Sequence, residues 1–164
     1  MDRRRMNSQV APQLALAPAV ANLLEDQDKP DYVMLQKFSR YAEALLSPDS
    51  TALDAVVEAD ARLHDLEAMG MPAGLAGLKA FRGMINSAFP DERAELLRFE
   101  LQGNDLVSAD LQATGTHRGE LMGVPPSNRV ARWLIHTRVR FQGEKVAERW
   151  DEVDVQELIG QLTK

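Results

Sequence analysis

The chain divides by its hydrophobic pattern into a helical first half and a second half of strands. Between residues 30 and 46, apolar side chains recur every three or four positions, which is the spacing of one helix face. A second, short helix is predicted after residue 50, where Thr51 and Asp54 resemble a capping box. A third is predicted from Gly74 to Phe89, because Pro90 cannot continue it. Residues 61–73 contain glycine and proline without a clear period, which predicts a loop.

Alternation replaces helical spacing after Pro90. Residues 95–102 and 106–116 are predicted strands joined by a turn that contains Gly103 and Asn104, both of which tolerate positive φ. Residues 130–141 and 144–150 form a second predicted hairpin, and residues 155–162 a closing amphipathic helix. Helices followed by antiparallel strands indicate an α+β domain with helices on one face of the sheet.

The alternation also assigns most side chains to a face of the sheet. In the third strand the inner set is Trp133, Ile135, Thr137, Val139 and Phe141. In the fourth strand Arg149 and Asp151 share one face, opposite Glu148 and Trp150. The pattern does not decide which of these two faces is the inner one.

Length, charge and composition narrow the function classes. A chain of 164 residues favours one domain, and a formal charge of −6 disfavours a nucleic-acid partner. No apolar run approaches the length of a membrane span. The chain has no cysteine, which excludes disulfides and thiolate sites and fits a cytoplasmic protein. We interpret residues 1–30 as an N-terminal arm or extra helix rather than an export signal, and residues 31–164 as the domain.

Several short motifs in the second half resemble the SnoaL-like polyketide cyclase family. They are Phe89-Pro-Asp91, Gly103-Asn-Asp105-Leu-Val107, Gly115-Thr-His-Arg-Gly119, Gly123-Val-Pro-Pro126 and Lys145-Val-Ala-Glu-Arg-Trp150. The resemblance runs from about Tyr41 to Leu162. It implies the nuclear transport factor 2-like fold, a cone of helices cupped by a strongly curved antiparallel sheet around a pocket. It also implies a hydrophobic small-molecule ligand, no cofactor, and a homodimer formed through the sheet.

The resemblance also implies roles for individual residues. In the family's cyclases one Asp serves as acid/base in an intramolecular aldol condensation, and Asp151 stands at the matching position. Two histidines flank that Asp in the cyclases, whereas Arg149 and Thr137 stand at those positions here. The expected substrate-binding residues are Arg149, Thr137, Ile135, Trp133, His64 and His117.

Asp151 has two open interpretations. An exposed Asp titrates near about 4 and is a poor base toward a carbon-bound proton, but burial in an apolar pocket raises its pKa. Alternatively, Asp151 pairs with Arg149 on the same face, which would lower its pKa and weaken it as a base. A raised pKa beside an open apolar cavity would favour catalysis, and a depressed one would favour a non-catalytic binding protein. A dimeric interaction module using the outer face around His136, Arg138 and Arg140 is a third possibility.

The remaining polar candidates have structural interpretations beside the functional ones. His117 points inward at the end of a strand and would fix the loop of residues 119–126, while His64 would lie near the pocket mouth. Asp154 would cap the last helix, and Glu148 and Glu152 would be solvated. The three histidines show no metal-ligand spacing, and the glycines lie in no strand-to-helix phosphate loop, so neither a metal nor a nucleotide site is predicted.

Overall fold

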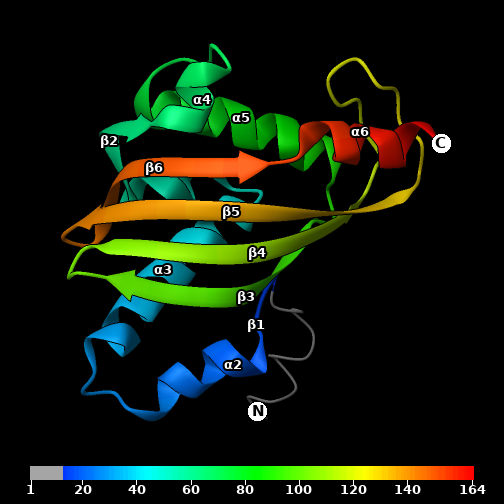
Figure 1. Cartoon of the computed structure of the whole chain (residues 1–164). Helices are drawn as coiled ribbons and strands as arrows, with labels where there is room; N and C mark the ends of the chain where they lie inside the picture. The colour runs from blue at the N-terminus through cyan, green and yellow to red at the C-terminus, as the bar shows by residue number, and fades with distance from the viewer. Residues whose placement is uncertain (1–12) are drawn as a thin grey trace, which may run out of the picture.

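A computed structural model describes residues 13–164 and contains one six-stranded sheet. The strand order is β1-β3-β4-β5-β6-β2, and Figure 1 shows the strands side by side. The central four strands are antiparallel: β3 (Arg93–Gln102), β4 (Leu106–Thr116), β5 (Val130–Gln142) and β6 (Lys145–Val153). The α+β class and both predicted hairpins are confirmed.

The two edge strands run parallel to their neighbours, so the sheet is mixed rather than purely antiparallel. β1 (Leu14–Leu16) pairs with β3, and β2 (Val57–Leu63) pairs with β6. β1 has only three residues and no period, whereas β2 alternates apolar and polar residues over its whole length, a strand signal that the loop predicted from residue 61 overlooks. The predicted N-terminal arm therefore contributes a strand to the sheet, followed by α2 (Pro18–Ala21) and the 3₁₀ helix η1 (Asn22–Glu25). Its first twelve residues lie outside the described part.

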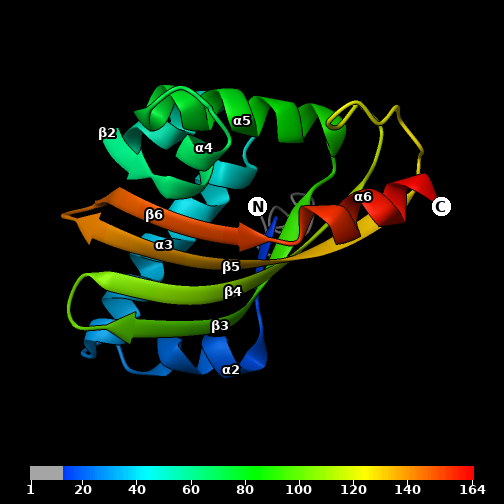
Figure 2. The same ribbon diagram turned by 45° about the horizontal axis from the view of Figure 1, so that its top comes forward.

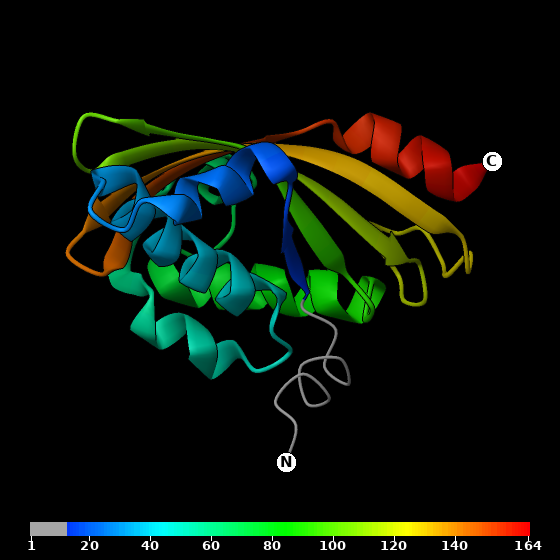
Figure 3. The same ribbon diagram turned by 90° about the horizontal axis from the view of Figure 1, so that it is seen from below.

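The helices cover one face of the sheet. α3 (Pro30–Leu46) and α5 (Gly74–Ala88) lie on the same side, as Figures 2 and 3 show, and α6 (Val155–Thr163) continues beyond β6. The buried face of α3 carries the predicted apolar residues, with Phe38 and Tyr41 almost completely enclosed. They pack with inward residues of β3 and β4 into the main core.

Two local predictions are wrong. Residues 61–73 are not a continuous loop: β2 extends to Leu63, and α4 (His64–Ala68) follows at once. Parallel pairing with β6 continues the strand to Leu63, in line with the alternation of apolar and polar residues from Val57 to Leu63. Residues 50–55 form the 3₁₀ helix η2 (Ser50–Ala55), which is capped by Asp49 accepting from the Thr51 amide rather than by a Thr51–Asp54 box.

A β-bulge in β6 decides the face that the sequence left open. Phe141 pairs with Val146 whereas Arg140 pairs with Glu148, so Ala147 is the extra residue. Simple alternation from the buried Val146 would direct Glu148 and Trp150 inward. The bulge shifts the alternation by one residue and places Arg149 and Asp151 on the inner face instead.

No helix in residues 13–164 is both long enough and apolar enough to cross a membrane.

Candidate active site

A cavity of about 450 Å³ lies between the inner face of the sheet and the helices. Its walls are mainly apolar and come from every layer of the fold; they include Phe38, Leu45, Phe81, Ile85, Leu111 and Trp133. Two groups of polar residues interrupt this lining. One surrounds Arg149 and Asp151 on β6, and the other is the pair Arg82 and Glu92.

Arg149 is the centre of the first polar group, and its side chain is only 3% exposed. Its Nε and Nη2 atoms donate to the two carboxylate oxygens of Asp65, over 3.1 and 2.7 Å. Nη1 donates to the Tyr41 hydroxyl oxygen over 3.1 Å. Asp151 is a more distant partner, with 3.4 Å between Nε of Arg149 and its Oδ2. The bidentate geometry, which is the stronger kind of pairing, therefore belongs to Asp65.

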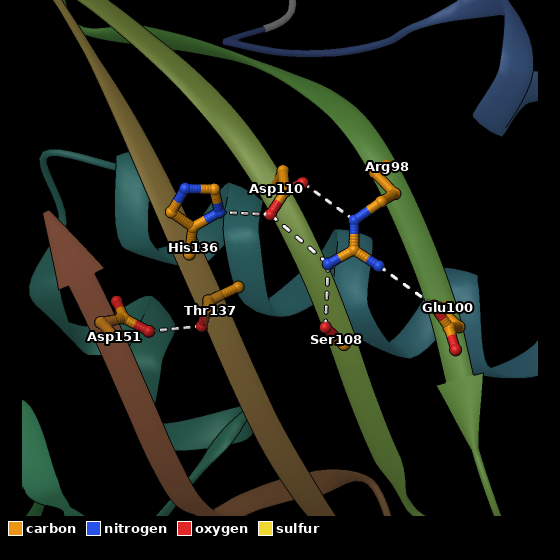
Figure 4. A network of polar contacts seen from close by, with 7 residues as sticks. All are labelled: Arg98, Glu100, Ser108, Asp110, His136, Thr137 and Asp151. Atoms are coloured by element: carbon orange, nitrogen blue, oxygen red, sulfur yellow. Dashed lines mark hydrogen bonds and ion pairs between the residues drawn. The ribbon is translucent and has the colours of Figure 1, made fainter.

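Asp151 also accepts a hydrogen bond from the Thr137 hydroxyl on the adjacent strand, and Figure 4 shows these two side chains next to each other. Burial raises the pKa of Asp151, and the nearby charge of Asp65 raises it too. Arg149, the Thr137 hydrogen bond and Arg82 act in the opposite direction but do not outweigh them, so the pKa stays above its ordinary value. A carboxyl group with a raised pKa is better suited to accept a proton from carbon.

Tyr41 is a member of the site that the sequence did not reveal. Helical spacing identifies it as a core residue, and the signal that was available is its hydroxyl, which requires a polar partner when it is buried. Burial raises the pKa of Tyr41 to about 12, so the phenol stays protonated at neutral pH although the charge of Arg149 opposes this shift. Because its oxygen accepts from Arg149, its O–H proton remains free to donate.

Asp65 was missed as well, because the sequence directs attention to its neighbour His64. The first turn of α4 presents Asp65 to Arg149 and turns His64 away from the cavity. His64 instead stacks on Trp150, with ring centroids 4.9 Å apart, and its Nε2 lies 2.7 Å from Glu148. Glu148 is therefore not simply solvated, since it also pairs with Arg140 over 2.5 Å.

Of the other predicted ligand-binding residues, Trp133, Ile135 and Thr137 line the cavity. His117 does not line it. Its Nδ1 contacts the hydroxyl and the backbone amide of Ser127, over 2.9 and 3.2 Å, which fixes the loop between β4 and β5. Asp154 caps α6 by accepting from the Glu157 amide, as predicted.

His136 lies on the outer face and hydrogen bonds to Asp110, which in turn accepts from Arg98 (Figure 4). Residues 13–164 contain no group of three or more His, Cys, Asp or Glu side chains placed to hold a metal ion.

The family model for SnoaL-like polyketide cyclases matches residues 36–162. The chain belongs to this family. The resemblance inferred from the motifs is thereby confirmed, and the matched range includes every residue that lines the cavity. A search of curated proteins finds no match.

Solved structures share this fold. TsrD from Streptomyces laurentii superposes with a TM-score of 0.71 at 22% identity, covering 79% of this chain and 94% of that one. IdmH, a putative polyketide cyclase from Streptomyces antibioticus, gives 0.68 at 26% identity over 79% and 98%. A putative polyketide cyclase from Bacillus cereus gives 0.69 at 21% identity over 91% and 89%.

Proposed function

We propose that this SnoaL-like protein is a cofactor-independent enzyme of the cyclase or isomerase type. Its substrate is a hydrophobic carbonyl compound bound in the cavity, and Asp151 is the general acid/base. The observation that carries the proposal is the raised pKa of Asp151 at the wall of an apolar cavity. Of the two interpretations that the sequence left open, this observation favours catalysis. Homodimerisation through the outer face of the sheet stays a prediction.

The distribution of charge around Arg149 supports Asp151 as the base. One guanidinium faces two carboxylates, and the closer contacts go to Asp65. The like charge of Asp65 makes a second buried carboxylate unfavourable, and this favours the protonated form of Asp151. Arg149 and Asp65 thus act as positioning residues, since they set the environment of Asp151 without themselves receiving the proton.

The Tyr41 hydroxyl is the hydrogen-bond donor that stabilises the substrate oxygen while Asp151 removes the proton. When Asp151 removes a proton from the carbon next to a carbonyl, the C–H electron pair forms a carbon–carbon double bond and the carbonyl π electrons move to oxygen. The Tyr41 O–H, oriented by the bond that its oxygen accepts from Arg149, can donate to that developing enolate oxygen. The enolate then attacks a second carbonyl in a cyclase, or is reprotonated by Asp151 at another carbon in an isomerase.

Hydrogen–deuterium exchange of a simple ketone tests the proton-transfer step without knowledge of the natural substrate. Naphthyl methyl ketone in D₂O exchanges its methyl protons through the enolate, and NMR follows the rate. We expect the wild-type protein to accelerate this exchange. Asp151→Asn should reduce the acceleration by about 10²–10⁴-fold, the usual contribution of a positioned general base.

Asp154→Asn is the matched control, because it makes the same substitution three residues along the chain. Asn caps a helix about as well as Asp, so α6 should be retained. Exchange in Asp154→Asn should equal that in the wild-type protein. Undiminished exchange in Asp151→Asn would refute the proposed base, and binding of the ketone without accelerated exchange in the wild-type protein would indicate a non-catalytic binding protein.

A further inference from the structure

The second polar group in the cavity, Arg82 and Glu92, makes no hydrogen bond or ion pair with Asp151, and the charge of Arg82 is only the last of the influences on the pKa of Asp151. Arg82 lies on α5, and Glu92 immediately precedes β3. Glu92 is only 4% exposed, and its Oε1 lies 2.5 Å from Nη2 of Arg82. Two strands, β4 and β5, separate β3 from β6, so this pair enters the cavity from a different side than Asp151 does.

Part of this pair has an evident structural role. Nε of Arg82 donates to the Leu45 carbonyl over 2.7 Å, and the neighbouring Asn86 side chain donates to the Ser47 carbonyl over 3.3 Å. These bonds satisfy carbonyl groups at the end of α3. They use Nε but leave Nη1 of Arg82 available, and they leave Glu92 unexplained.

Two atoms of the pair have no hydrogen-bond partner among residues 13–164: Nη1 of Arg82 and Oε2 of Glu92. Within that part of the chain, His117 Nε2 is the only side-chain polar atom that is both fully enclosed and unpartnered. The two free atoms of the pair are therefore not sealed in the protein. Since both residues line the cavity, the accessible space beside them is the cavity itself.

The chemistry of these two atoms limits what they can bind. Nη1 is a donor and Oε2 an acceptor, and the ion pair as a whole is neutral. A ligand carboxylate would meet the negative charge of Glu92, and an ammonium group would meet the positive charge of Arg82. A ketone oxygen would satisfy Arg82 but not Glu92. A primary amide could satisfy both, but its remaining donor and lone pair would be desolvated without partners in the apolar cavity.

We propose that Arg82 and Glu92 form a second binding subsite, which recognises a hydroxyl group of a neutral, apolar carbonyl ligand. The hydroxyl accepts from Nη1 of Arg82 and donates to Oε2 of Glu92. The subsite defines a substrate class for the function proposed above and rests on that function: a ketone with its reacting carbon at Asp151 and an enolic or phenolic hydroxyl directed toward α5.

Three related ketones test the subsite by equilibrium binding. They are a hydroxynaphthyl methyl ketone, its methyl ether, and the parent naphthyl methyl ketone without the added oxygen. Hydrogen bonds to charged groups contribute about 1.5–3 kcal/mol, so the wild-type protein should bind the hydroxy ketone at least about 10-fold more tightly than the methyl ether. Equal affinities in the wild-type protein would overturn the subsite.

Variants of Arg82 and Glu92 test whether these two residues cause the preference for the hydroxy ketone over its methyl ether. The double variant Arg82→Gln with Glu92→Gln removes both charges together, which avoids leaving a buried charge unpaired. It should bind the parent ketone like the wild-type protein but lose the preference for the hydroxy ketone. The control is Lys79→Gln with Asp54→Asn, which removes another ion pair of α5 that lies outside the cavity lining. The control should keep the full preference.

Glu92→Asp covers the case in which the double variant does not fold. It keeps both charges and withdraws the acceptor by one methylene, so the preference should fall while the parent ketone still binds. A preference that survives in either variant would overturn the subsite.

Asp151→Asn should keep the preference, because Asp151 is not part of the subsite. The two proposals can therefore fail independently. The subsite is tested by the affinities of the three ketones, and Asp151 as the base is tested by the rate of methyl-proton exchange in Asp151→Asn.

Discussion

The inner and outer faces of the sheet each carry an aspartate paired with an arginine, and the two aspartates differ in pKa. Asp151 on β6 lies on the inner face beside Arg149, and Asp110 on β4 lies on the outer face beside Arg98. Each also contacts a residue of β5, Thr137 or His136, and these two residues are consecutive (Figure 4). Yet burial raises the pKa of Asp151, whereas the hydrogen bond from Arg98 lowers that of Asp110.

The exposed fractions of the two carboxylate side chains are similar, at 17% for Asp151 and 20% for Asp110, so the stronger effect of burial on Asp151 comes from its enclosed surroundings. The arginines differ much more, at 3% for Arg149 and 45% for Arg98. Arg98 directs two bonds of 2.8 and 3.4 Å to Asp110, while Arg149 directs its bidentate contact to Asp65. Arg149 also lowers the pKa of Asp151, but burial and the charge of Asp65 outweigh it, whereas at Asp110 the hydrogen bond from Arg98 outweighs the effect of burial.

Substitution of each arginine should give the largest difference between the two faces, measured as the loss in the free energy of unfolding. Arg149→Met leaves Asp65 and Asp151 without their cation in a buried site, which should lower the free energy of unfolding by about 3–5 kcal/mol. Arg98→Met removes a largely exposed partner and should cost about 0–1 kcal/mol. Urea denaturation at neutral pH measures both.

A rescue variant separates the charge effect from simple loss of packing. Adding Asp65→Asn to Arg149→Met removes one of the two stranded carboxylates, so part of the lost stability should return. Equal losses in the two single variants, or no recovery in the double variant, would contradict the assignment of Arg149 as the cation of a buried cluster.

Tyr41→Phe tests whether the inner face stabilises an enolate. The change removes only the O–H group, and loss of one such donor lowers rates by about 10²–10³-fold in other enzymes. The methyl-proton exchange of naphthyl methyl ketone should fall by that factor while the ketone still binds. Tyr32→Phe is the matched control, because Tyr32 lies on the same helix and its hydroxyl contacts only the exposed Gln36 among the described residues. An unchanged rate in Tyr41→Phe would exclude this role.

Much of the sheet could be predicted from the sequence because alternation and turn glycines are local signals. The inner set of β5 and both hairpins follow directly from them. The edge strand β1 could not, because its three residues carry no period and are stabilised by their pairing with β3. The alternation of β2 is visible in the sequence, but its parallel pairing with the distant β6 is not.

The site was harder to predict than the fold. The motif resemblance identified Asp151, but the bulge at Ala147 decides its face, and a bulge shifts alternation without a clear mark in the sequence. Tyr41 and Asp65 belong to the site only because α3 and α4 bring them to Arg149 from more than eighty residues away along the chain. The sequence predicts His64 as the residue near the pocket, but it is Asp65 that lines the cavity. Residue type alone therefore does not reveal which of two neighbours faces inward.

The pH dependence of stability should have opposite signs for the two aspartates. Asp151 has a raised pKa in the folded state, so its protonated form stabilises the protein fully below its unfolded pKa of about 3.9 and loses this effect as the pH rises through the folded value. Asp110 has a lowered pKa, so its contribution is present above about 3.9 and is lost as the pH falls through the folded value.

Urea denaturation across a pH series, with Asp151→Asn and Asp110→Asn, isolates the two contributions. Relative to Asp151→Asn, the wild-type protein should lose stability as the pH rises above about 4; relative to Asp110→Asn, it should lose stability as the pH falls below about 4. Each difference should amount to about 1.4 kcal/mol for every unit by which the folded pKa departs from the unfolded one. Slopes of the same sign would mean that Arg149 controls Asp151 just as Arg98 controls Asp110, and the inner carboxylate would then be an ion-pair partner rather than a base.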